Sequence, residues 1–173
     1  MEYTAILEKQ ILGRLKVDNP WWTEGKVPSF YGKMSPRLYL DIFYPLVKDV
    51  DIQRAIILMG PRRVGKTVMI YHSIKKLIDE GVSPQNIIYV SVETPIYNNI
   101  LLEQLFNLAC QILGKEKGKE QFYVFFDEIQ YLKDWEINLK SLVDTYHNVK
   151  FVASGSAAAA LKKSSNESGA GRF

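Results

Sequence analysis

At residues 60–67 the chain reads Gly60-Pro61-Arg62-Arg63-Val64-Gly65-Lys66-Thr67, which fits the phosphate-binding pattern G-x-x-x-x-G-K-[ST] at every fixed position. The mostly apolar residues 54–59 before it are typical of a short strand, and residues 68–71 continue as the start of a helix. This order of strand, loop and helix is the context in which the pattern binds phosphate. The stretch, called the phosphate loop below, therefore predicts a nucleoside triphosphate binder.

The residue types of the phosphate loop suit a polyphosphate. Gly60 and Gly65 lack a Cβ, so the backbone can approach the phosphates closely and point its N–H groups at them. Lys66 is expected to reach the β- and γ-phosphates, and the Thr67 hydroxyl to bind Mg²⁺. The residues expected to contact the nucleotide are Gly60, Pro61, Arg62, Arg63, Val64, Gly65, Lys66, Thr67 and Val68.

A second apolar run, residues 122–126, leads directly into Asp127 and Glu128. Asp127 is expected to hold Mg²⁺ through its water shell, and Glu128 to orient and polarise the attacking water. A carboxylate in the position of Glu128 favours hydrolysis over phosphoryl transfer to a small acceptor, because a kinase would exclude that water. The alternative is that the two acids only begin a surface turn.

Polar residues at other strand ends could complete the site. Ser154 and Ser156 follow the last apolar run, and either could contact the γ-phosphate or the lytic water. We favour Ser156, with an ordinary strand-end turn as the alternative for both. Glu93 and Thr94 end another run and would face the rim of the site, although a structural role is favoured for them.

Other notable side chains receive structural interpretations. Arg62 and Arg63 occupy unrestricted positions of the pattern, where solvated charges are favoured over a contact with phosphate or a partner. His72 and His147 have no metal-ligand company in the sequence and are expected on helix surfaces. Cys110 is expected to be an inert residue in or beside the core. The adjacent tryptophans, Trp21 and Trp22, are expected to be packing anchors, with an adenine platform as the alternative.

Hydrophobic periodicity alternates between strand and helix along most of the chain. Helices are expected at residues 2–16, from 35 to 46, at 66–80, at 99–113 and from 135 to 146, and strands at 54–59, 87–92, 122–126 and 149–153. Three of these helices have a predicted inner face: Tyr39, Leu40, Phe43 and Leu46 in the helix from 35, Ile70, Ile74, Leu77 and Ile78 in that from 66, and Leu101, Leu105, Leu108 and Ile112 in that from 99. Pro45 should kink or shorten the first, and Asp134 could cap the last helix. The alternation predicts an α/β fold with a parallel sheet.

Composition limits the class of protein. The chain has 173 residues, enough for one domain with a sizeable core, and is 47% hydrophobic and 24% charged. Its net charge of +3 is too small to argue for nucleic acid, no apolar run reaches the length of a membrane span, and the first residues lack a signal peptide's pattern. One cysteine cannot form an internal disulfide. We therefore expect a cytoplasmic protein without a membrane partner.

With these motifs in place, the chain resembles a family of prokaryotic AAA-type ATPases in which an N-terminal ATPase domain precedes a C-terminal domain. Besides the phosphate loop, the matching pieces are residues 126–132 (Phe-Asp-Glu-Ile-Gln-Tyr-Leu), 154–157 (Ser-Gly-Ser-Ala), 19–22 (Asn-Pro-Trp-Trp) and 171–173 (Gly-Arg-Phe). The resemblance implies a P-loop core of the additional-strand class, with ATP as the nucleotide. It also makes Arg172 a candidate γ-phosphate or intersubunit arginine, with disorder near a chain end as the alternative.

The resemblance also sets an expectation about organisation. Residues 1–50 would form a helical N-terminal extension and residues 51–173 the P-loop ATPase core. A core of this kind needs a further strand beside the phosphate-loop strand, and no run after Ser156 suits it. We therefore expect the last strand, the lid and the C-terminal domain to lie outside this sequence.

The leading hypothesis is a Mg²⁺-dependent ATPase whose hydrolysis drives a conformational change in a following domain or partner. A second is an ATP-dependent switch or scaffold with little turnover, and a third is a small-molecule kinase. A protein or DNA partner and a homo-oligomer are compatible with the family, but no residue here selects between them.

Overall fold

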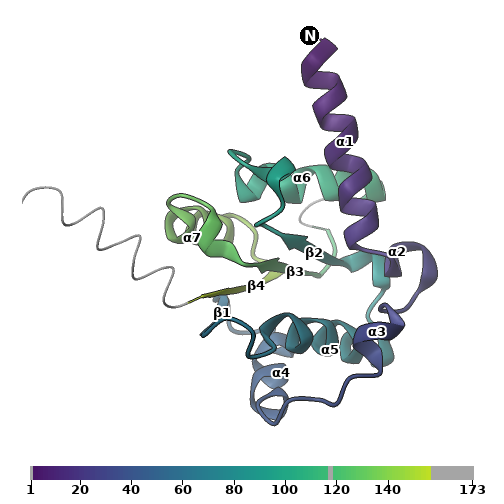
Figure 1. Ribbon diagram of the computed structural model, residues 1–173, viewed down its shortest axis with the longest axis vertical. Coiled ribbons are helices and arrows are strands. Elements are labelled where there is room, and N and C mark those ends of the chain that lie inside the picture. The colour runs from purple at the N-terminus through teal and green to yellow at the C-terminus, as the bar shows by residue number, and fades with distance from the viewer. Residues whose placement is uncertain (1, 117–118, 157–173) are drawn as a thin grey trace, which may run out of the picture.

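The computed structural model describes residues 2–116 and 119–156, and the side chains from residue 7 onward. A four-stranded parallel sheet forms its centre, in the order β1-β4-β3-β2 (Figure 1). The strands are β1 (Ile56–Gly60), β2 (Ile87–Ser91), β3 (Phe122–Asp127) and β4 (Val149–Ser156). The predicted parallel α/β fold is thus confirmed, and β4 lies between the strand that enters the phosphate loop and the strand that ends in the two acids.

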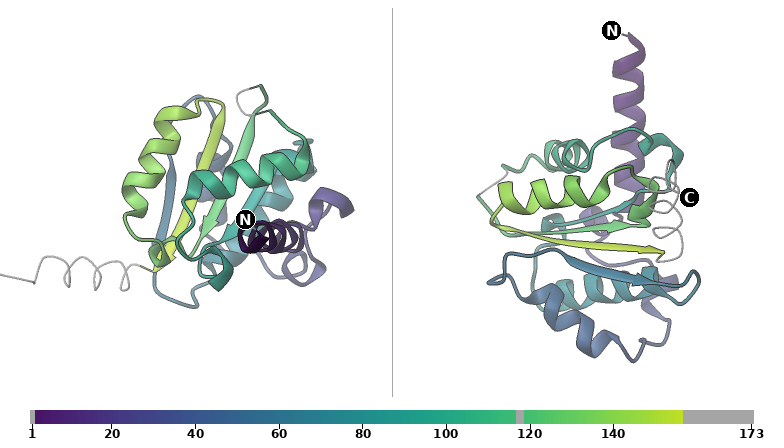
Figure 2. Two further views of the ribbon diagram at one scale, coloured as in Figure 1. Left: turned by 90° about the horizontal axis from the view of Figure 1, so that it is seen from above. Right: turned by 90° about the vertical axis from the view of Figure 1, so that its left-hand side faces the viewer.

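Helices cover both faces of the sheet. The longer ones are α1 (Glu2–Asp18), α4 (Leu40–Lys48), α5 (Lys66–Asp79), α6 (Leu102–Leu113) and α7 (Trp135–Thr145). The short ones are α2 (Trp21–Glu24), α3 (Ser29–Gly32) and the 3₁₀ turns η1 (Pro84–Asn86), η2 (Pro95–Tyr97) and η3 (Ile129–Tyr131). α4 and α5 lie on one face and α6 and α7 on the other, while α1 stands beside β2 (Figures 1 and 2). Both faces of the central strands are therefore covered, as their continuous apolar sequences require.

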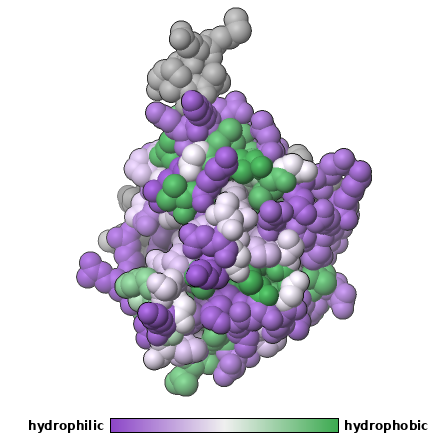
Figure 3. Space-filling view, turned by 90° about the vertical axis from the view of Figure 1, so that its right-hand side faces the viewer, coloured by the Kyte–Doolittle hydropathy of each residue, from purple (hydrophilic) through white to green (hydrophobic). Residues whose placement is uncertain are grey.

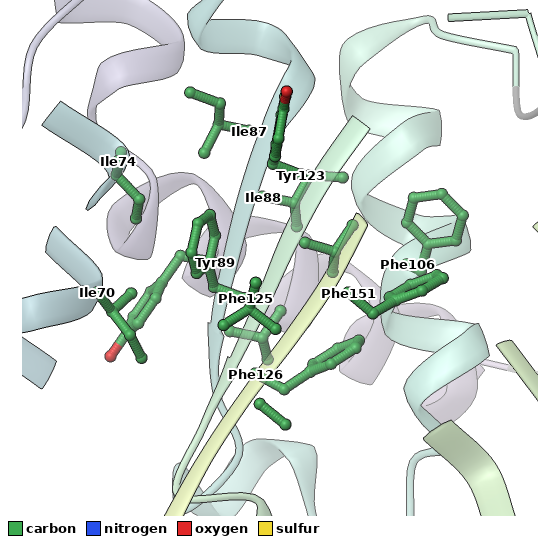
Figure 4. Close-up of a cluster of buried hydrophobic side chains, with 14 of the residues drawn as sticks. Ile70, Ile74, Ile87, Ile88, Tyr89, Phe106, Tyr123, Phe125, Phe126 and Phe151 are labelled. Carbon is green, nitrogen blue, oxygen red and sulfur yellow. The ribbon is translucent and has the colours of Figure 1, made fainter. Parts of the chain in front are cut away.

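Strand alternation divides the core between the two faces. Figure 4 shows Ile70 and Ile74 of α5 on one side of the sheet and Phe106 of α6 on the other. On the α6 side, the Phe106 ring meets Phe122 and Phe151 edge-on, with ring centroids 6.0 and 6.1 Å apart. Every residue of β3 and β4 is buried. These two strands form the rigid centre from which the polar strand ends project.

The sequence Asn-Pro-Trp-Trp at 19–22 covers the outer edge of β2. The Asn19 amide donates to the Tyr89 carbonyl (2.8 Å) and accepts from the Tyr89 N–H (2.6 Å), as a neighbouring strand would. Trp21 and Trp22 both donate their indole N–H to the Ile87 carbonyl, at 2.9 and 2.8 Å. Both tryptophans are buried, so their prediction as packing anchors is confirmed. Covering an edge strand in this way removes a site for unwanted strand pairing.

The N-terminal helices expose a mostly polar surface and bury their apolar side chains. Seen from the side of α1 and α2, the molecule is mostly hydrophilic, with small separate apolar areas (Figure 3). Leu15 and Trp21 are fully buried, and they belong to the same hydrophobic core as Ile70 and Phe125. The N-terminal helices therefore share one core with the sheet, and the division at residues 50 and 51 stays a prediction.

The front part of the chain corrects several expectations. α4 begins at Leu40 and not at Ser35, and it continues three residues beyond Pro45. Its buried residues are Leu40, Phe43, Tyr44 and Val47. This i, i+3, i+4, i+7 stripe follows from the later start, and it leaves Tyr39 and Leu46 exposed. The stretch between residues 19 and 34, expected to be irregular, contains the one-turn helices α2 and α3.

Three further expectations are wrong in detail. α6 begins at Leu102, which leaves Leu101 half-exposed before the helix and turns Phe106, Ala109 and Cys110 inward. Asp134 precedes α7 with φ 53° and makes no side-chain cap. His72, expected on a helix surface, is buried on α5, where its Nε2 contacts the Tyr31 carbonyl at 2.9 Å. His72 is buried because α3 packs against this side of α5.

Candidate nucleotide site

The phosphate loop runs from the end of β1 to the start of α5. Gly65 has φ 94°, a conformation that a residue with a Cβ adopts only with strain, and its carbonyl accepts the Met69 N–H in the first turn of α5 (3.0 Å). Arg63 also has positive φ, at 64°. The loop thus turns sharply before α5, whose N-terminus is a favourable place for an anion.

Lys66 lies folded over the phosphate loop. Its side chain is buried, and its ammonium donates to the carbonyl oxygens of Pro61 (2.9 Å) and Gly60 (3.3 Å). Neutral carbonyls are weaker partners for an ammonium than phosphate oxygens. Lys66 can therefore exchange these contacts for a bound polyphosphate with a short movement.

Asp127 is the centre of a buried hydroxyl cluster. The Thr67 hydroxyl donates to its Oδ2 at 2.7 Å and the Tyr89 hydroxyl to the same oxygen at 3.0 Å. Ser154 donates its hydroxyl to Oδ1. Strand alternation places Tyr89, Asp127 and Ser154 on the face of the sheet that carries α5, at whose first turn Thr67 lies. Hydroxyls from three elements, α5, β2 and β4, therefore hold the one carboxylate at the end of β3.

Tyr89 was not among the expected site residues. Burial and the nearby charge of Asp127 raise the pKa of its phenol, so Tyr89 stays a neutral donor. One sequence feature could have drawn attention to it: Tyr89 is the aromatic residue in a strand whose other residues before Ser91 are aliphatic. That it faces Asp127 follows from the strand register, in which Ser91, two residues further on, pairs with Asp127.

Glu128 lies next to Asp127 and is held by a second unforeseen residue, Gln130. Glu128 adopts a left-handed conformation with φ 54°. The Gln130 amide donates to the Glu128 carboxylate and accepts the backbone N–H of Ser156 at 3.0 Å. Ser156 thus enters the site through its backbone, whereas Ser154 enters through its hydroxyl.

Gly155 is part of the same junction. A Cβ built on Gly155 would lie 2.7 Å from Gln130 Oε1 and 3.1 Å from Met59 Sδ. A side chain at position 155 would therefore push against the amide of Gln130. Even an alanine here would have to displace the ends of the Gln130 and Met59 side chains.

Glu93 and Thr94, expected at the rim of the site, lie just beyond the end of β2. Burial, then the charges of Glu128 and Asp127, raise the pKa of Glu93, which places its carboxylate in the field of both acids. Thr94 lies partly buried beside it. Arg62 donates to the Tyr131 hydroxyl at 2.9 Å, so this loop arginine has a protein partner, while Arg63 is exposed. His147 is exposed, but it lies in the turn after α7 and not on a helix, and it contacts Gln53.

On its other side the phosphate loop borders an apolar cavity of about 740 Å³. Its walls are the segment before α4, α4 itself, β1 and the loop. They consist of Pro36, Arg37, Leu38, Tyr39, Ile42, Phe43, Leu46, Leu58, Met59, Gly60, Pro61, Val64, Lys66 and Met69. A concave, mostly apolar space of this size with a few cationic groups at one end can take a heterocyclic ring system.

Comparison with known proteins places the chain in a family. A family model described as an AAA domain matches residues 52–173. The chain belongs to this AAA domain family. Membership indicates nucleotide binding, in agreement with the phosphate loop at its expected place between β1 and α5.

The relatives of this AAA domain are longer proteins. An uncharacterised protein of Methanocaldococcus jannaschii, MJ1637, is 32% identical over 142 residues, which cover 79% of this chain and 29% of the relative. An uncharacterised protein of Haemophilus influenzae is 31% identical over 112 residues, 63% of this chain and 26% of the relative. The chain thus spans less than a third of the length of these curated relatives. No solved structure matches it significantly.

Some expectations for the AAA domain fall outside the described part of the chain. Arg172 lies within residues 157–173, beyond the last described residue, so its role stays a prediction.

Within residues 2–116 and 119–156, no group of three or more His, Cys, Asp and Glu side chains could hold a metal. In the same ranges no helix has the length and apolar character needed to cross a membrane.

Proposed function

We propose that the AAA domain binds and hydrolyses ATP with Mg²⁺ and couples hydrolysis to a conformational change in a following domain or a partner. The observation that carries the proposal is the 2.7 Å contact between Thr67, at the end of the phosphate loop, and Asp127, at the end of β3. This contact joins the phosphate loop to a carboxylate at the carboxyl-terminal ends of the strands. Glu128 stands directly beside that point.

ATP binding would use both sides of the phosphate loop. The backbone N–H groups of the loop, with Lys66 and the first turn of α5 up to Val68, would contact the phosphates. The apolar cavity bordered by Tyr39, Ile42 and Met59 would take the base. Apolar walls alone do not select adenine over guanine, so the choice of ATP rests on the resemblance to AAA-type ATPases.

Thr67 and Asp127 would hold Mg²⁺. A hydroxyl and a carboxylate are the oxygen donors that this cation prefers, and they already lie within hydrogen-bonding distance of each other. With only two protein donors, the remaining positions would belong to phosphate oxygens and water, in keeping with the usual sites of this cation. The bound cation would neutralise charge on the phosphates.

Hydrolysis would depend on Glu128 as the group that orients and polarises the attacking water. Ser156 and Ser154, at the tip of β4, would contribute polar groups near the γ-phosphate. Arg172 stays a candidate γ-phosphate or intersubunit arginine within the longer family-matched region.

The switch hypothesis also has a supporting observation. Gln130 donates a hydrogen bond to the Glu128 carboxylate. A general base engaged in this way would activate water slowly, so the protein would bind ATP without rapid turnover. A strand from outside the described residues would fit the free edge of β1, where Ile57 is half-exposed. Such a strand, or a neighbouring copy of the protein, would supply the contacts that release Glu128.

The test is ATP binding and steady-state hydrolysis with Mg²⁺, for the wild type, Glu128→Gln and Lys66→Ala. The ATPase proposal expects hydrolysis by the wild type only, with ATP binding retained in Glu128→Gln and weakened in Lys66→Ala. Binding without turnover in the wild type would favour the switch. No ATP binding by the wild type would refute both.

A further inference from the structure

Arg37 stands over the phosphate loop, although it lies 28 positions before Gly65 in the chain. A Cβ built on Gly65 would lie 2.6 Å from Arg37 Nε and 3.1 Å from its Cζ. The guanidinium therefore rests directly on the loop backbone. It also lines the same cavity as Lys66.

The charges around Arg37 are unfavourable without an anion. The guanidinium sits at the positive N-terminal end of α5, close to a second cation, Lys66. Within residues 2–116 and 119–156, no carboxylate forms an ion pair with Arg37, whereas Arg14 pairs with Asp18 at 2.8 Å. A planar guanidinium with free donors at such a place suits phosphate oxygens well.

The position of Arg37 also indicates which phosphates it meets. The cavity that it lines includes Gly60, Val64 and Lys66 but neither Asp127 nor Glu128. Arg37 thus lines the cavity proposed for the base, whose lining contains neither of the two acids, and the first phosphates would lie between that cavity and the acids. The γ-phosphate would lie further from the cavity, next to Thr67 and Asp127.

We propose that Arg37 is a nucleotide-binding residue that contacts the α- or β-phosphate from the segment before α4. This inference rests on the proposed nucleotide binding and extends it to an element outside the phosphate loop. Arg37 lies three residues before Leu40, the first residue of α4. Nucleotide binding would therefore fix the segment between α3 and α4 against the loop and close one side of the cavity.

The test compares Arg37→Gln and Arg37→Lys with a matched control, Arg54→Gln. Arg54 is also exposed but lies before the opposite end of β1. Titration calorimetry would give the affinities for ATP and ADP without Mg²⁺, and thermal unfolding would give Tm with and without ADP. Because a charge-assisted contact to a phosphate shared by both nucleotides is lost, Arg37→Gln should bind ATP and ADP about tenfold more weakly.

A second readout separates binding from a structural role. Without nucleotide, Arg37→Gln should have an unchanged or higher Tm, because a cation is removed from the positive end of α5. Its Tm increase on adding ADP should shrink, Arg37→Lys should fall between it and the wild type, and Arg54→Gln should match the wild type. Equal affinities in the wild type and Arg37→Gln would refute the inference alone.

Two other outcomes would also overturn it. A loss for ATP but not for ADP would move the contact to the γ-phosphate, and a lower Tm without nucleotide in both Arg37 variants would show a structural role. Absence of ATP and ADP binding in the wild type would instead refute the proposed function, and this inference with it.

Discussion

The two sides of the phosphate loop are built differently. The metal side, comprising Thr67, Asp127, Ser154, Glu128 and Gln130, consists of side chains tied to one another by hydrogen bonds, with Asp127 and Ser154 buried. The cavity side, comprising Arg37, Tyr39, Ile42 and Val64, consists of exposed side chains around an apolar space. The metal side is ordered before any ligand arrives, whereas the cavity side depends on a ligand or another segment to cover it.

This difference agrees with the tasks that we propose for the two sides. Chemistry at a phosphate gains from groups whose positions are fixed in advance, because no reorganisation is then needed during the reaction. Binding of a base gains mainly from covering apolar surface, which tolerates variation in position. Substitutions on the metal side should therefore lower the rate of hydrolysis, and those on the cavity side should lower affinity.

The largest effect is expected for Asp127→Asn. The amide keeps the size of the carboxylate and can still pair with the hydroxyls of Thr67, Tyr89 and Ser154, so the fold should survive. The negative charge that would hold Mg²⁺ is lost, and the hydrolysis rate should fall by at least about 100-fold. Steady-state kinetics across a Mg²⁺ series would measure it. A wild-type rate in this variant would contradict the metal-binding role of Asp127.

A smaller effect is expected for Gln130→Met. Methionine is close to glutamine in shape but leaves both Glu128 and the Ser156 N–H without the amide. On the ATPase proposal, in which Gln130 positions Glu128, kcat should drop about tenfold while the dissociation constant for ATP changes by less than about twofold. On the switch hypothesis, in which Gln130 restrains Glu128, kcat should rise instead. Separate binding and single-turnover measurements would distinguish the two quantities.

Gly155→Ala offers an independent route to the same junction. Its Cβ would press on Gln130 Oε1 from β4, so it should lower kcat in the same direction. If Gln130→Met weakened ATP binding as much as hydrolysis, Gln130 would be structural and not a positioning residue.

On the cavity side, Ile42→Ser should weaken ATP binding by about threefold, because removing a few tens of Å² of covered apolar area costs about 0.7 kcal/mol. Ile42 is 68% exposed, so the free energy of unfolding without nucleotide should change by less than about 0.5 kcal/mol. Ile137→Ser on α7, 71% exposed and remote from the cavity, is the matched control. Equal ATP affinities in the two variants would exclude the cavity as the base site.

Sequence patterns predicted the sheet and the metal side better than the cavity side. The strands are continuous apolar runs between helices, and the pattern G-x-x-x-x-G-K-[ST] defines the local backbone geometry by itself. The strands and the phosphate loop could therefore both be predicted from the sequence. The partners Tyr89 and Gln130 depend on which strands are neighbours, and the order β1-β4-β3-β2 is not encoded in any local motif. Tyr89 could be placed only once β2 was paired with β3, and the link from Gln130 to Ser156 only once β4 was placed beside β3.

The errors that bear on the cavity side lie in the segment before α4 and in α4 itself. Pro36 and Ser35 resemble a helix start, but α4 begins at Leu40, and the shift rotates its buried face. Helix starts are poorly determined by local sequence. The helix expected from 35 to 46 would include Arg37, which instead lies in the connecting segment that touches Gly65. The position of this segment depends on tertiary packing, which periodicity does not report.

The smallest predicted effect uses pH to compare the two sides. Of the two, only the metal side concentrates acids, and burial together with Glu128 and Asp127 raises the pKa of Glu93. An acid with a raised pKa in the folded state binds its proton more tightly there than in the unfolded chain. Its contribution to the free energy of unfolding is therefore complete at low pH and declines as pH rises from about 4.3, the ordinary glutamate value, through the raised folded-state value.

Glu93→Gln should remove that decline. Because Glu93 is exposed and screened by solvent, the gain in the free energy of unfolding at neutral pH should be no more than a few tenths of a kcal/mol. Urea unfolding between pH 4 and about pH 8, with Glu24→Gln as the control from an exposed position on α2, would measure the difference. If both variants followed the wild-type pH profile equally, the acids of the metal side would not interact with Glu93. Its ionisation would then be independent of Asp127 and Glu128, and the charge contrast between the two sides would stop at those two carboxylates.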